Sequence, residues 1–332
     1  MHINLEIKIV LAMLKTIMST NLKTLDANST LKDAVSLMVT NNIRRVPISV
    51  AGNIIGIVTA RDIIKEAVSK QNWAEEKLAD IAKPAVTVDP DTPFRTAAKL
   101  MARLGIGSLL VKGQGIVTER DIAKVVPRVR IPAIAVGNTN VITLNGDNTI
   151  ADAEKLMATM GISHIPVVSG SDVIGVVSIR DVLKALNDGT LNSKLSEVAS
   201  KQLIYADEDA TIAEVADLIT AKNVGSVLLF EDEPKLANLR GIVTEWDLVR
   251  TFANMVRAHV LIKAESSKIR GLVAALFAMP RVYDVAVVYG PYDLLVTLDV
   301  EDPDLVATTV LNSIASLSGV KETTTLIEAE VI

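Results

Sequence analysis

A heptapeptide of fixed pattern occurs four times in the sequence, and this repetition constrains the fold more than any other feature. Each copy has a glycine, two apolar residues, a hydroxyl residue, two variable residues and an aspartate. The closing aspartates are 59, 60 and 66 residues apart. A regular period of this length predicts an internal fourfold repeat of one small structural unit. The copies cover residues 56–62, 115–121, 175–181 and 241–247.

Each heptapeptide has the pattern of a strand that leads into a helix. The apolar pair after the glycine is typical of a buried strand, and an apolar helical pattern follows the aspartate. The hydroxyl oxygen can cap the helix, and the aspartate three residues later suits the positive end of the helix dipole. A helix start also suits a phosphate. The spacing alone leaves two interpretations open: four structural capping boxes, or four ligand sites.

The composition argues against several classes of function. The 332 residues carry a net charge of −5 and no strongly basic block, which argues against a nucleic-acid surface. Without cysteine there is no disulfide, thiol nucleophile or thiolate metal site. His2, His164 and His259 lie far apart and lack metal-ligand spacing. No paired carboxylates or nucleophile–base pair emerge, so we predict a protein that is not an enzyme and has no catalytic cofactor.

The N-terminal apolar run over residues 7–18 resembles neither a membrane span nor a signal segment. It is interrupted by Lys8 and Lys15, it is too short to cross a bilayer, and no small-residue cleavage site follows. We therefore expect a cytoplasmic protein. Met13 and Met18 are alternative starts, and residues 1–12 are interpreted as either a non-native extension or a packing strand.

Apolar periodicity gives every repeat the order strand, helix, strand, strand, helix. In the first repeat, Ser29 or Thr30 is the candidate cap of the first helix. In the fourth repeat, a charged loop is inserted over residues 231–240, which belongs on the surface. The predicted repeats cover residues 16–70, 77–127, 135–187 and 195–253.

Odd and even repeats differ just before their second strand. The odd repeats have basic or polar pairs there, whereas the even repeats have Gly-Ser. Two tandem pairs, joined by a proline-containing linker near residues 125–132, are therefore the natural units. The four pairs of residues are Arg44-Arg45, Gly107-Ser108, Ser163-His164 and Gly225-Ser226.

With its fourfold motif and alternation, the chain resembles four CBS domains, small βαββα modules that pair into Bateman modules. The resemblance covers about residues 16–252. Four repeats in one chain are similar to the gamma subunit of the AMP-activated protein kinase. The resemblance implies that paired sheets leave two clefts in each module, which bind adenosine nucleotides or related ligands.

The resemblance also assigns roles within the heptapeptide. The aspartate is the expected acceptor of both ribose hydroxyls, because its two oxygens suit a vicinal diol. The hydroxyl residue would donate to phosphate or ribose, and the first apolar residue would line a slot for the base. In repeat order, the aspartates are Asp62, Asp121, Asp181 and Asp247, the hydroxyl residues are Thr59, Thr118, Ser178 and Thr244, and the apolar residues are Ile57, Ile116, Val176 and Ile242.

Basic residues complete the expected sites. Arg44, Arg45 and His164 lie where the family places phosphate-contacting residues, which often reach across from the neighbouring repeat. Guanidinium forks match phosphate oxygens, whereas a lone histidine is equally well explained as a hydrogen-bonded packing residue. The arginines before the aspartates face either phosphate or solvent. These arginines are Arg61, Arg120 and Arg180.

Repeats two and four depart from the pattern of basic residues. Repeat two has Ser108 at the basic position, so phosphate charge there must be met from repeat one. Repeat four has Trp246 in place of the arginine, which leaves its ligand open and offers a surface for stacking on a base. We expect at least one occupied cleft in each module. The module with Arg44 and Arg45 is expected to take the more highly charged nucleotide.

Residues 258–332 have the pattern βαββαβ, a ferredoxin-like arrangement. Ser266 or Ser267 is the expected cap of its first helix, which is predicted to run to Met279. The segments GPYDLLV at 290–296 and GVKETTT at 319–325 resemble the effector-binding domain of the Lrp/AsnC family. This resemblance implies pairing of sheets into a homodimer and an amino-acid site near the turn. The candidate contacts are Gly290, Tyr292 and Asp293, although Asp293 is also explained as a plain turn residue.

We therefore predict an α+β protein that acts as a non-enzymatic regulatory sensor. AMP, ADP or ATP would bind in the CBS clefts and change the geometry between modules. S-adenosylmethionine suits the same aspartate and apolar slot. The expected partners are this small molecule, a second copy of the chain and an unknown regulated protein, with no nucleic acid and no membrane. Two alternatives stay open: an amino-acid-responsive transcriptional co-regulator that acts through the C-terminal domain, and a scaffold with empty clefts.

Overall fold

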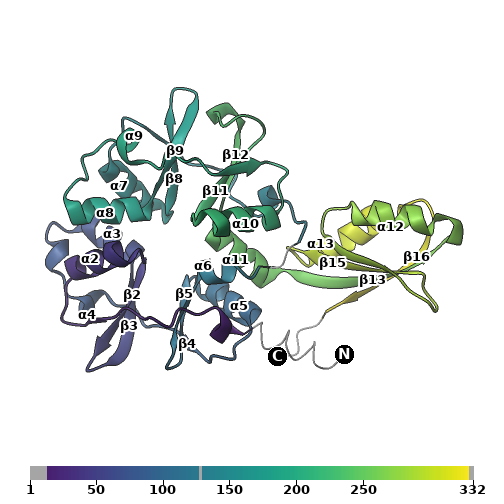
Figure 1. The fold of residues 1–332 in the computed structure, drawn as a ribbon, viewed down its shortest axis with the longest axis horizontal. Coiled ribbons are helices and arrows are strands. Elements are labelled where there is room, and N and C mark those ends of the chain that lie inside the picture. Colours follow the sequence, from purple (N-terminus) through teal and green to yellow (C-terminus); the bar gives the residue numbers. More distant parts are fainter. Residues whose placement is uncertain (1–12, 127–128, 329–332) are drawn as a thin grey trace.

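The computed structural model describes residues 13–126 and 129–328, and the two interpretations of residues 1–12 lie outside these ranges. Four similar units form a ring, and a fifth domain projects from one side of it (Figure 1). In the part of the chain that the structure describes, no helix has the length and apolar character needed to cross a membrane. The architecture confirms the predicted α+β class with four repeats and a separate C-terminal domain.

The first repeat has the predicted order of elements. A short turn, η1 (Leu14–Thr16), precedes β1 (Leu25–Asp26), α2 (Leu31–Asn41), β2 (Arg45–Val50), β3 (Asn53–Thr59) and α3 (Ala60–Ser69). Strand β1 pairs parallel to β2, and β2 pairs antiparallel to β3. The helix between β1 and β2 makes the parallel pairing geometrically accessible, because parallel neighbours need a crossover connection.

The other repeats keep this order and sheet topology. Repeat two has β4 (Thr87–Val88), α5 (Phe94–Leu104), β5 (Ser108–Val111), β6 (Gly115–Thr118) and α6 (Glu119–Ala123). Repeat three has β7 (Leu144–Asn145), α7 (Ile150–Met160), β8 (His164–Ser169), β9 (Asp172–Ser178) and α8 (Ile179–Asp188). Repeat four has β10 (Tyr205–Asp207), α10 (Ile212–Lys222), β11 (Ser226–Phe230), β12 (Leu239–Thr244) and α11 (Glu245–Asn254).

Short helical turns connect these elements. They are η2 (Trp73–Glu75), α4 (Leu78–Ile81), η3 (Ala133–Ala135), α9 (Leu195–Val198) and η4 (Leu236–Asn238). The turn η4 lies within the inserted loop of repeat four. Strand β7 is shorter than the apolar run at residues 141–144 suggests, because only its end pairs with β8.

Capping boxes start the helices that follow the heptapeptides, as the sequence predicts. Thr59 caps α3, and the Asp62 carboxylate returns to the Thr59 backbone N–H. The same reciprocal bonds occur at the starts of α6, α8 and α11. Helices α2, α7 and α10 also begin with a capping box, and Thr30 is the cap of α2. The hydroxyl residues therefore satisfy backbone donors that would otherwise have no partner at the helix start.

Two cores hold the ring together through helix contacts. One joins repeats one and three, where α2 and α3 pack against α8 and α7. The other joins repeats two and four, where α11 packs against α5 and α6 and encloses Leu14. The sheets of repeats three and four meet through a smaller cluster that includes the fully buried Phe230. Helix contacts therefore join the two modules, whereas the sheets of repeats three and four meet within one module. Figure 1 shows the resulting ring.

The segment that precedes each repeat crosses to the last strand of the partner repeat. Ser19 pairs with Ile116, and Lys83 pairs with Ile57. Equivalent bridges join Asn138 to Ile242 and Ser200 to Val176. The tandem pairs are therefore interlocked by backbone hydrogen bonds, and each crossing segment lies beside the first apolar position of a heptapeptide.

The C-terminal domain is a four-stranded antiparallel sheet with helices packed on it. Its strand order, β14-β15-β13-β16, confirms the predicted ferredoxin-like arrangement. The buried residues of β13 alternate along the strand and pack against the helices, so the opposite sheet face is left without helices. The elements are β13 (Val256–Ala264), α12 (Ile269–Phe277), β14 (Val282–Val287), β15 (Leu294–Val300), α13 (Asp304–Thr308), η6 (Thr309–Ile314) and β16 (Val320–Ile327).

The predicted serine cap in this domain is wrong. Ser266 and Ser267 belong to a 3-10 turn, η5 (Ser266–Lys268), and α12 begins at Ile269 without a side-chain cap. The Ser267 hydroxyl donates to the Glu265 carboxylate at 2.9 Å instead. The helix ends at Phe277, before Met279. The Ser267 hydroxyl thus bonds to a neighbouring side chain and caps no backbone N–H group of the helix.

The first helix of every repeat ends at a residue in the left-handed conformation. Asn42 has φ 52°, Gly105 φ 64°, Gly161 φ 68° and Asn223 φ 54°. Glycine and asparagine tolerate this region better than other residues do. The chain therefore uses two residue types for one backbone requirement.

We predict that Gly161→Ala lowers the free energy of unfolding by about 1 kcal/mol, because alanine is strained in this conformation. A Cβ atom at Gly161 would meet nothing within 4 Å, so the loss would come from the backbone alone. Gly161→Asn, which copies Asn42 and Asn223, is the matched control and should lose less. Urea titration measures both, and equal losses would contradict the prediction.

Candidate functional site

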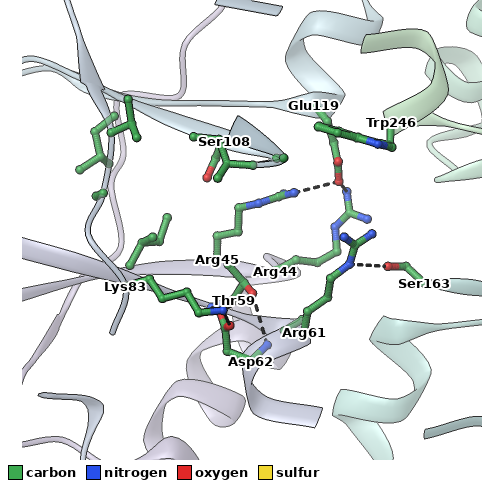
Figure 2. Close-up of a pocket in the computed structure, with 18 of the residues that line it drawn as sticks. Arg44, Arg45, Thr59, Arg61, Asp62, Lys83, Ser108, Glu119, Ser163 and Trp246 are labelled. Atoms are coloured by element: carbon green, nitrogen blue, oxygen red, sulfur yellow. Dashed lines mark hydrogen bonds and ion pairs between the residues drawn. The ribbon is translucent and has the colours of Figure 1, made fainter. Parts of the chain in front are cut away.

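A cavity of about 490 Å³, cavity one, lies where repeats one and two meet and brings together one set of the predicted residues (Figure 2). Ile57 and Thr59 come from the end of β3, and Asp62 comes from the first turn of α3. Arg44 and Arg45 approach from the start of β2, and Arg61 extends from α3. The six lining residues predicted from the sequence are Ile57, Thr59, Asp62, Arg44, Arg45 and Arg61.

Asp62 is fixed by its capping box and by a lysine. One carboxylate oxygen accepts from the Thr59 backbone N–H at 2.9 Å and from the Thr59 hydroxyl at 2.6 Å. The other oxygen forms an ion pair with Lys83 Nζ. Lys83 lies in the crossing segment, and its side chain is 70% exposed. Lys83 was not predicted from the sequence, because only the backbone bridge between Ile57 and Lys83 places it in the cavity.

Two glutamates that the sequence analysis did not predict form ion pairs with the arginines. Glu119 Oε1 lies 2.9 Å from Arg45 Nη2 and 3.1 Å from Arg44 Nη2. Glu245 Oε2 lies 2.5 Å from Arg44 Nη2, and Glu245 Oε1 accepts from Arg120 Nε at 2.5 Å. We call these five residues the central ion-pair cluster. Three repeats contribute to it: Arg44 and Arg45 from repeat one, Glu119 and Arg120 from repeat two, and Glu245 from repeat four.

A second odd–even alternation in the sequence marks these glutamates. The residue after the hydroxyl position is Glu119 or Glu245 in the even repeats, but Ala60 or Ile179 in the odd repeats. Burial raises the pKa of Glu119, but the charges of Arg45 and Arg44 outweigh burial and lower the pKa to about 2. The Glu119 carboxylate is therefore charged at neutral pH.

The first odd–even alternation is explained by close packing across each pair. A Cβ atom on Gly107 would overlap Arg45 Nη2, and a Cβ atom on Gly225 would overlap His164 Nε2. The even repeats therefore need glycine so that the basic residue of the odd repeat can extend over them. The Gly-Ser pair of each even repeat therefore packs against the basic residue of its odd partner.

The remaining arginines of the heptapeptides differ in their contacts. Arg61 Nε lies 3.3 Å from Ser163 Oγ in repeat three, and Arg120 Nη1 lies 2.6 Å from Asn223 Oδ1 in repeat four. Both thus make contacts between the two modules. Burial, followed by the charge of Arg44, lowers the pKa of Arg180 to about 10. Arg180 lines a small cavity of about 160 Å³ together with Asp181.

A further cavity of about 180 Å³, cavity two, lies where repeats three and four meet. Six predicted residues line it: Ile242, Thr244, Asp247, His164, Arg44 and Arg61. The residues common to cavities one and two are Arg44, Arg61, Glu119, Ser163 and Trp246. Trp246, which departs from the arginine pattern, therefore forms part of the wall of both.

The other two heptapeptides keep their local geometry. Thr118 and Asp121 form a capping box, and Asp121 also pairs with Lys124 at 3.1 Å. Ser178 and Asp181 form the same box in repeat three. Within the described ranges, the linings of cavities one and two do not include these four residues, nor Ile116 and Val176. Ligand roles for these six residues stay predictions.

The candidate amino-acid contacts lie around one turn of the C-terminal domain. Gly290 has φ 138°, which favours glycine. The Tyr292 hydroxyl lies 2.9 Å from Thr324 Oγ1. Asp293 Oδ2 accepts from the Ala264 backbone N–H at 2.8 Å. Asp293 therefore has a structural partner, and its contact with an amino acid stays a prediction.

Comparison with protein families assigns most of the chain to known domain families. A model of the CBS domain matches residues 14–69, 78–128, 134–188 and 195–254. These segments make up more than half of the chain. The chain belongs to the CBS-domain proteins. The model of the Lrp/AsnC ligand binding domain matches residues 257–331. Both predicted resemblances are thus confirmed.

Several relatives share the CBS region. Inosine-5'-monophosphate dehydrogenase of Methanocaldococcus jannaschii is 28% identical over 192 residues, covering 55% of this chain and 37% of the dehydrogenase. Protein MJ1225 of the same organism is 23% identical over 264 residues, covering 68% of this chain and 93% of that protein. The chain therefore spans little more than a third of the dehydrogenase, but nearly all of MJ1225.

Solved structures show the same fold. The crystal structure of MJ1225, proposed as an archaeal homologue of the gamma subunit of the AMP-activated protein kinase, has a TM-score of 0.62. The sequences are 20% identical, and the match covers 73% of this chain and all of that one. A conserved protein from Pyrococcus horikoshii has a TM-score of 0.52 at 20% identity, covering 72% and 99% of the two chains.

We predict that His164 makes the CBS ring less stable in acid. Burial, followed by the charges of Arg44 and Arg180, lowers the pKa of His164 from 6.5 to about 3, although Glu245 and Glu119 act in the opposite direction. The unfolded chain therefore binds the proton first as the pH falls. The stability that neutral His164 contributes is complete above about pH 6.5 and is lost toward about pH 3, by up to about 1.4 kcal/mol per pH unit.

Trp246 fluorescence can measure this loss, because Trp246 and His164 line the same cavity. The chain has two tryptophans, so Trp73→Phe leaves Trp246 as the reporter. In this Trp73→Phe background, urea titration measures the free energy of unfolding between about pH 5 and 6.5. This free energy should depend less steeply on pH in the His164→Gln variant than in the protein that keeps His164. The same pH dependence in both would contradict the prediction.

Proposed function

We propose that this CBS-domain protein is a non-enzymatic regulatory sensor, and that cavity one binds an adenine nucleotide. One observation carries the proposal: an apolar residue, a fixed carboxylate and several guanidinium groups line the same cavity. These groups suit the base, the ribose diol and the phosphate of one ligand. AMP, ADP and ATP have all three parts, and S-adenosylmethionine has the first two.

The contacts of Asp62 suit a ribose. Its capping-box oxygen already accepts two hydrogen bonds, whereas its other oxygen faces the exposed Lys83. The pair joins a buried carboxylate to an ammonium group that is 70% exposed, so solvent screens the interaction. Two ribose hydroxyls can therefore replace Lys83 at Asp62 with little loss of free energy. The released ammonium group would then be available to a phosphate.

The central ion-pair cluster provides a path from ligand to ring geometry. Arg44 contacts Glu119 of repeat two and Glu245 of repeat four. A negatively charged phosphate beside this cluster would repel both carboxylates and so weaken a contact between the two modules. A ligand shifts an equilibrium between two arrangements when it prefers one of them. This differential preference would pass the signal to a regulated protein.

The matches to known proteins support a regulatory role. CBS repeats together with an Lrp/AsnC ligand-binding domain form a regulatory architecture. The match to the dehydrogenase covers only 37% of that enzyme, so its activity does not transfer to this chain. The proposal that the chain is not an enzyme rests on this architecture.

We further propose that the C-terminal domain forms a homodimer through its open sheet face. Leu261 pairs with Leu295 across β13 and β15, and Ala286 pairs with Leu295 across β14 and β15. These side chains share the face opposite the buried stripe of β13, and Leu326 on β16 is 53% exposed. Pairing two copies would cover these apolar side chains.

Asp62→Ala tests the nucleotide site. We expect AMP to bind at least about tenfold more weakly, because hydrogen bonds to a charged carboxylate are lost. Asp33→Ala is the matched control: Asp33 forms the same capping box with Thr30 at α2, but it does not line cavity one. Both variants should lose about 1 kcal/mol of stability with the cap.

Isothermal titration calorimetry on the full chain separates the possible outcomes. Weaker AMP binding in Asp62→Ala together with unchanged binding in Asp33→Ala supports the site. Equal binding in all three proteins would place the ligand elsewhere. If amino acids bind and no adenosine compound does, the nucleotide proposal fails. That result would support the alternative of an amino-acid-responsive transcriptional co-regulator.

Leu295→Lys tests the dimer. A charge on the open sheet face should halve the mass measured by light scattering, because a buried lysine without a partner disfavours association. Leu311→Lys is the control: Leu311 is 68% exposed in η6, a helix on the other side of the sheet. A wild-type chain with the mass of one copy would contradict the proposal.

A further inference from the structure

We propose that Glu119 limits the phosphate charge that cavity one accepts, so that the cavity selects an adenosine monophosphate over the triphosphate. This inference rests on the proposed nucleotide site and specifies its ligand. It assigns to Glu119 a role in specificity, distinct from contact with base or ribose.

Glu119 is positioned to set the charge of the phosphate region. It is the first residue of α6, it is 8% exposed, and its carboxylate lies between Arg44 and Arg45 (Figure 2). Gly107 leaves the space it needs, since a Cβ atom there would lie 3.0 Å from Glu119 Oε2. The carboxylate thus occupies the arginine nitrogens that a phosphate would otherwise contact.

Not every basic side chain of cavity one is paired with a buried glutamate. Arg44 and Arg45 pair with Glu119, and Arg44 also pairs with Glu245. Among the residues that the structure describes, Arg61 contacts the Ser163 hydroxyl and forms no ion pair. Lys83 pairs with Asp62, the predicted ribose acceptor. Two cations, Arg61 and Lys83, are therefore available to a phosphate once the ribose occupies Asp62.

The positive charge of Arg61 and Lys83 matches the negative charge of one phosphate group. A phosphate monoester carries about −1.5 to −2 charges at neutral pH, which two cations balance. Each additional phosphate group adds negative charge and extends toward the guanidinium groups that Glu119 holds. The longer ligand must either approach the Glu119 carboxylate or displace it from both arginines. Displacement would leave a buried charge without a partner, which is strongly unfavourable.

The four repeats differ at this position. Ala60 and Ile179 occupy it in the odd repeats, and both line cavity one without adding charge. Glu245 occupies it in repeat four, where Arg44 and Arg120 pair with it. A capping box forms with either type of residue. The helix start therefore does not require a glutamate, and another reason must account for the carboxylate.

Calorimetric titration of the full chain with AMP and with ATP tests the proposal. We expect wild-type protein to bind AMP at least about tenfold more tightly than ATP. Glu119→Gln should reduce this ratio by about tenfold or more, because it removes one negative charge a few ångströms from the added phosphates. Glu214→Gln is the matched control, since it removes the same charge at the exposed start of α10 and should leave the ratio unchanged.

A double variant keeps the test decisive if Glu119→Gln fails to fold. Arg45→Gln with Glu119→Gln removes both members of one ion pair, so the net charge of the cavity equals that of the wild type. This variant should keep the preference for AMP, because Arg61 and Lys83 are unchanged. A double variant that binds ATP as tightly as AMP would overturn the proposal.

The result also distinguishes this inference from the proposed function. Equal affinities for AMP and ATP in the wild type, or the same ratio in Glu119→Gln, would overturn the role of Glu119 and leave the nucleotide site intact. If neither nucleotide binds the wild-type chain, both proposals fail.

Discussion

Buried charge at the meeting point of the repeats is the constraint on which the ring depends. Arg44 has a side chain only 9% exposed, and a guanidinium group in that position is unfavourable without carboxylate partners. Glu119 and Glu245 supply these partners from repeats two and four. The ring is therefore stable only when three repeats bring their charges together. Arg44 and Glu119 line both cavities, and Glu245 lines cavity two, which links the stability of the ring to the proposed ligand sites.

The capping boxes show how one local motif serves two purposes. Seven helices of the CBS region begin with a capping box, including three that do not follow a heptapeptide. The box alone is therefore structural and does not indicate a ligand. Asp62 differs from Asp33 because the surrounding chain places an apolar residue, a lysine and arginines beside it. The proposed ligand site is the place where the box meets these residues.

The C-terminal domain is attached to the ring by more than chain connectivity. Arg130, in the linker between the two modules, lies over the Phe277 ring at 5.6 Å and donates to the Phe277 carbonyl at 2.5 Å. The Arg281 backbone N–H donates to the Arg130 carbonyl at 3.2 Å. A change in module geometry would therefore act directly on the base of the C-terminal domain.

The sequence by itself determined the repeats, the order of their elements, the helix caps and the ferredoxin-like order, because these follow from local spacing and apolar periodicity. Local pattern failed at Ser266 and Ser267, which lie in a 3-10 turn before α12, where the Ser267 hydroxyl donates to the Glu265 carboxylate. Only the tertiary structure decided which heptapeptides line cavities one and two, and which carboxylates hold the arginines. Arg45 and Glu119 are 74 residues apart, and Arg44 and Glu245 are 201 apart. No local pattern encodes such pairs, since they form only when separate repeats pack around a common centre.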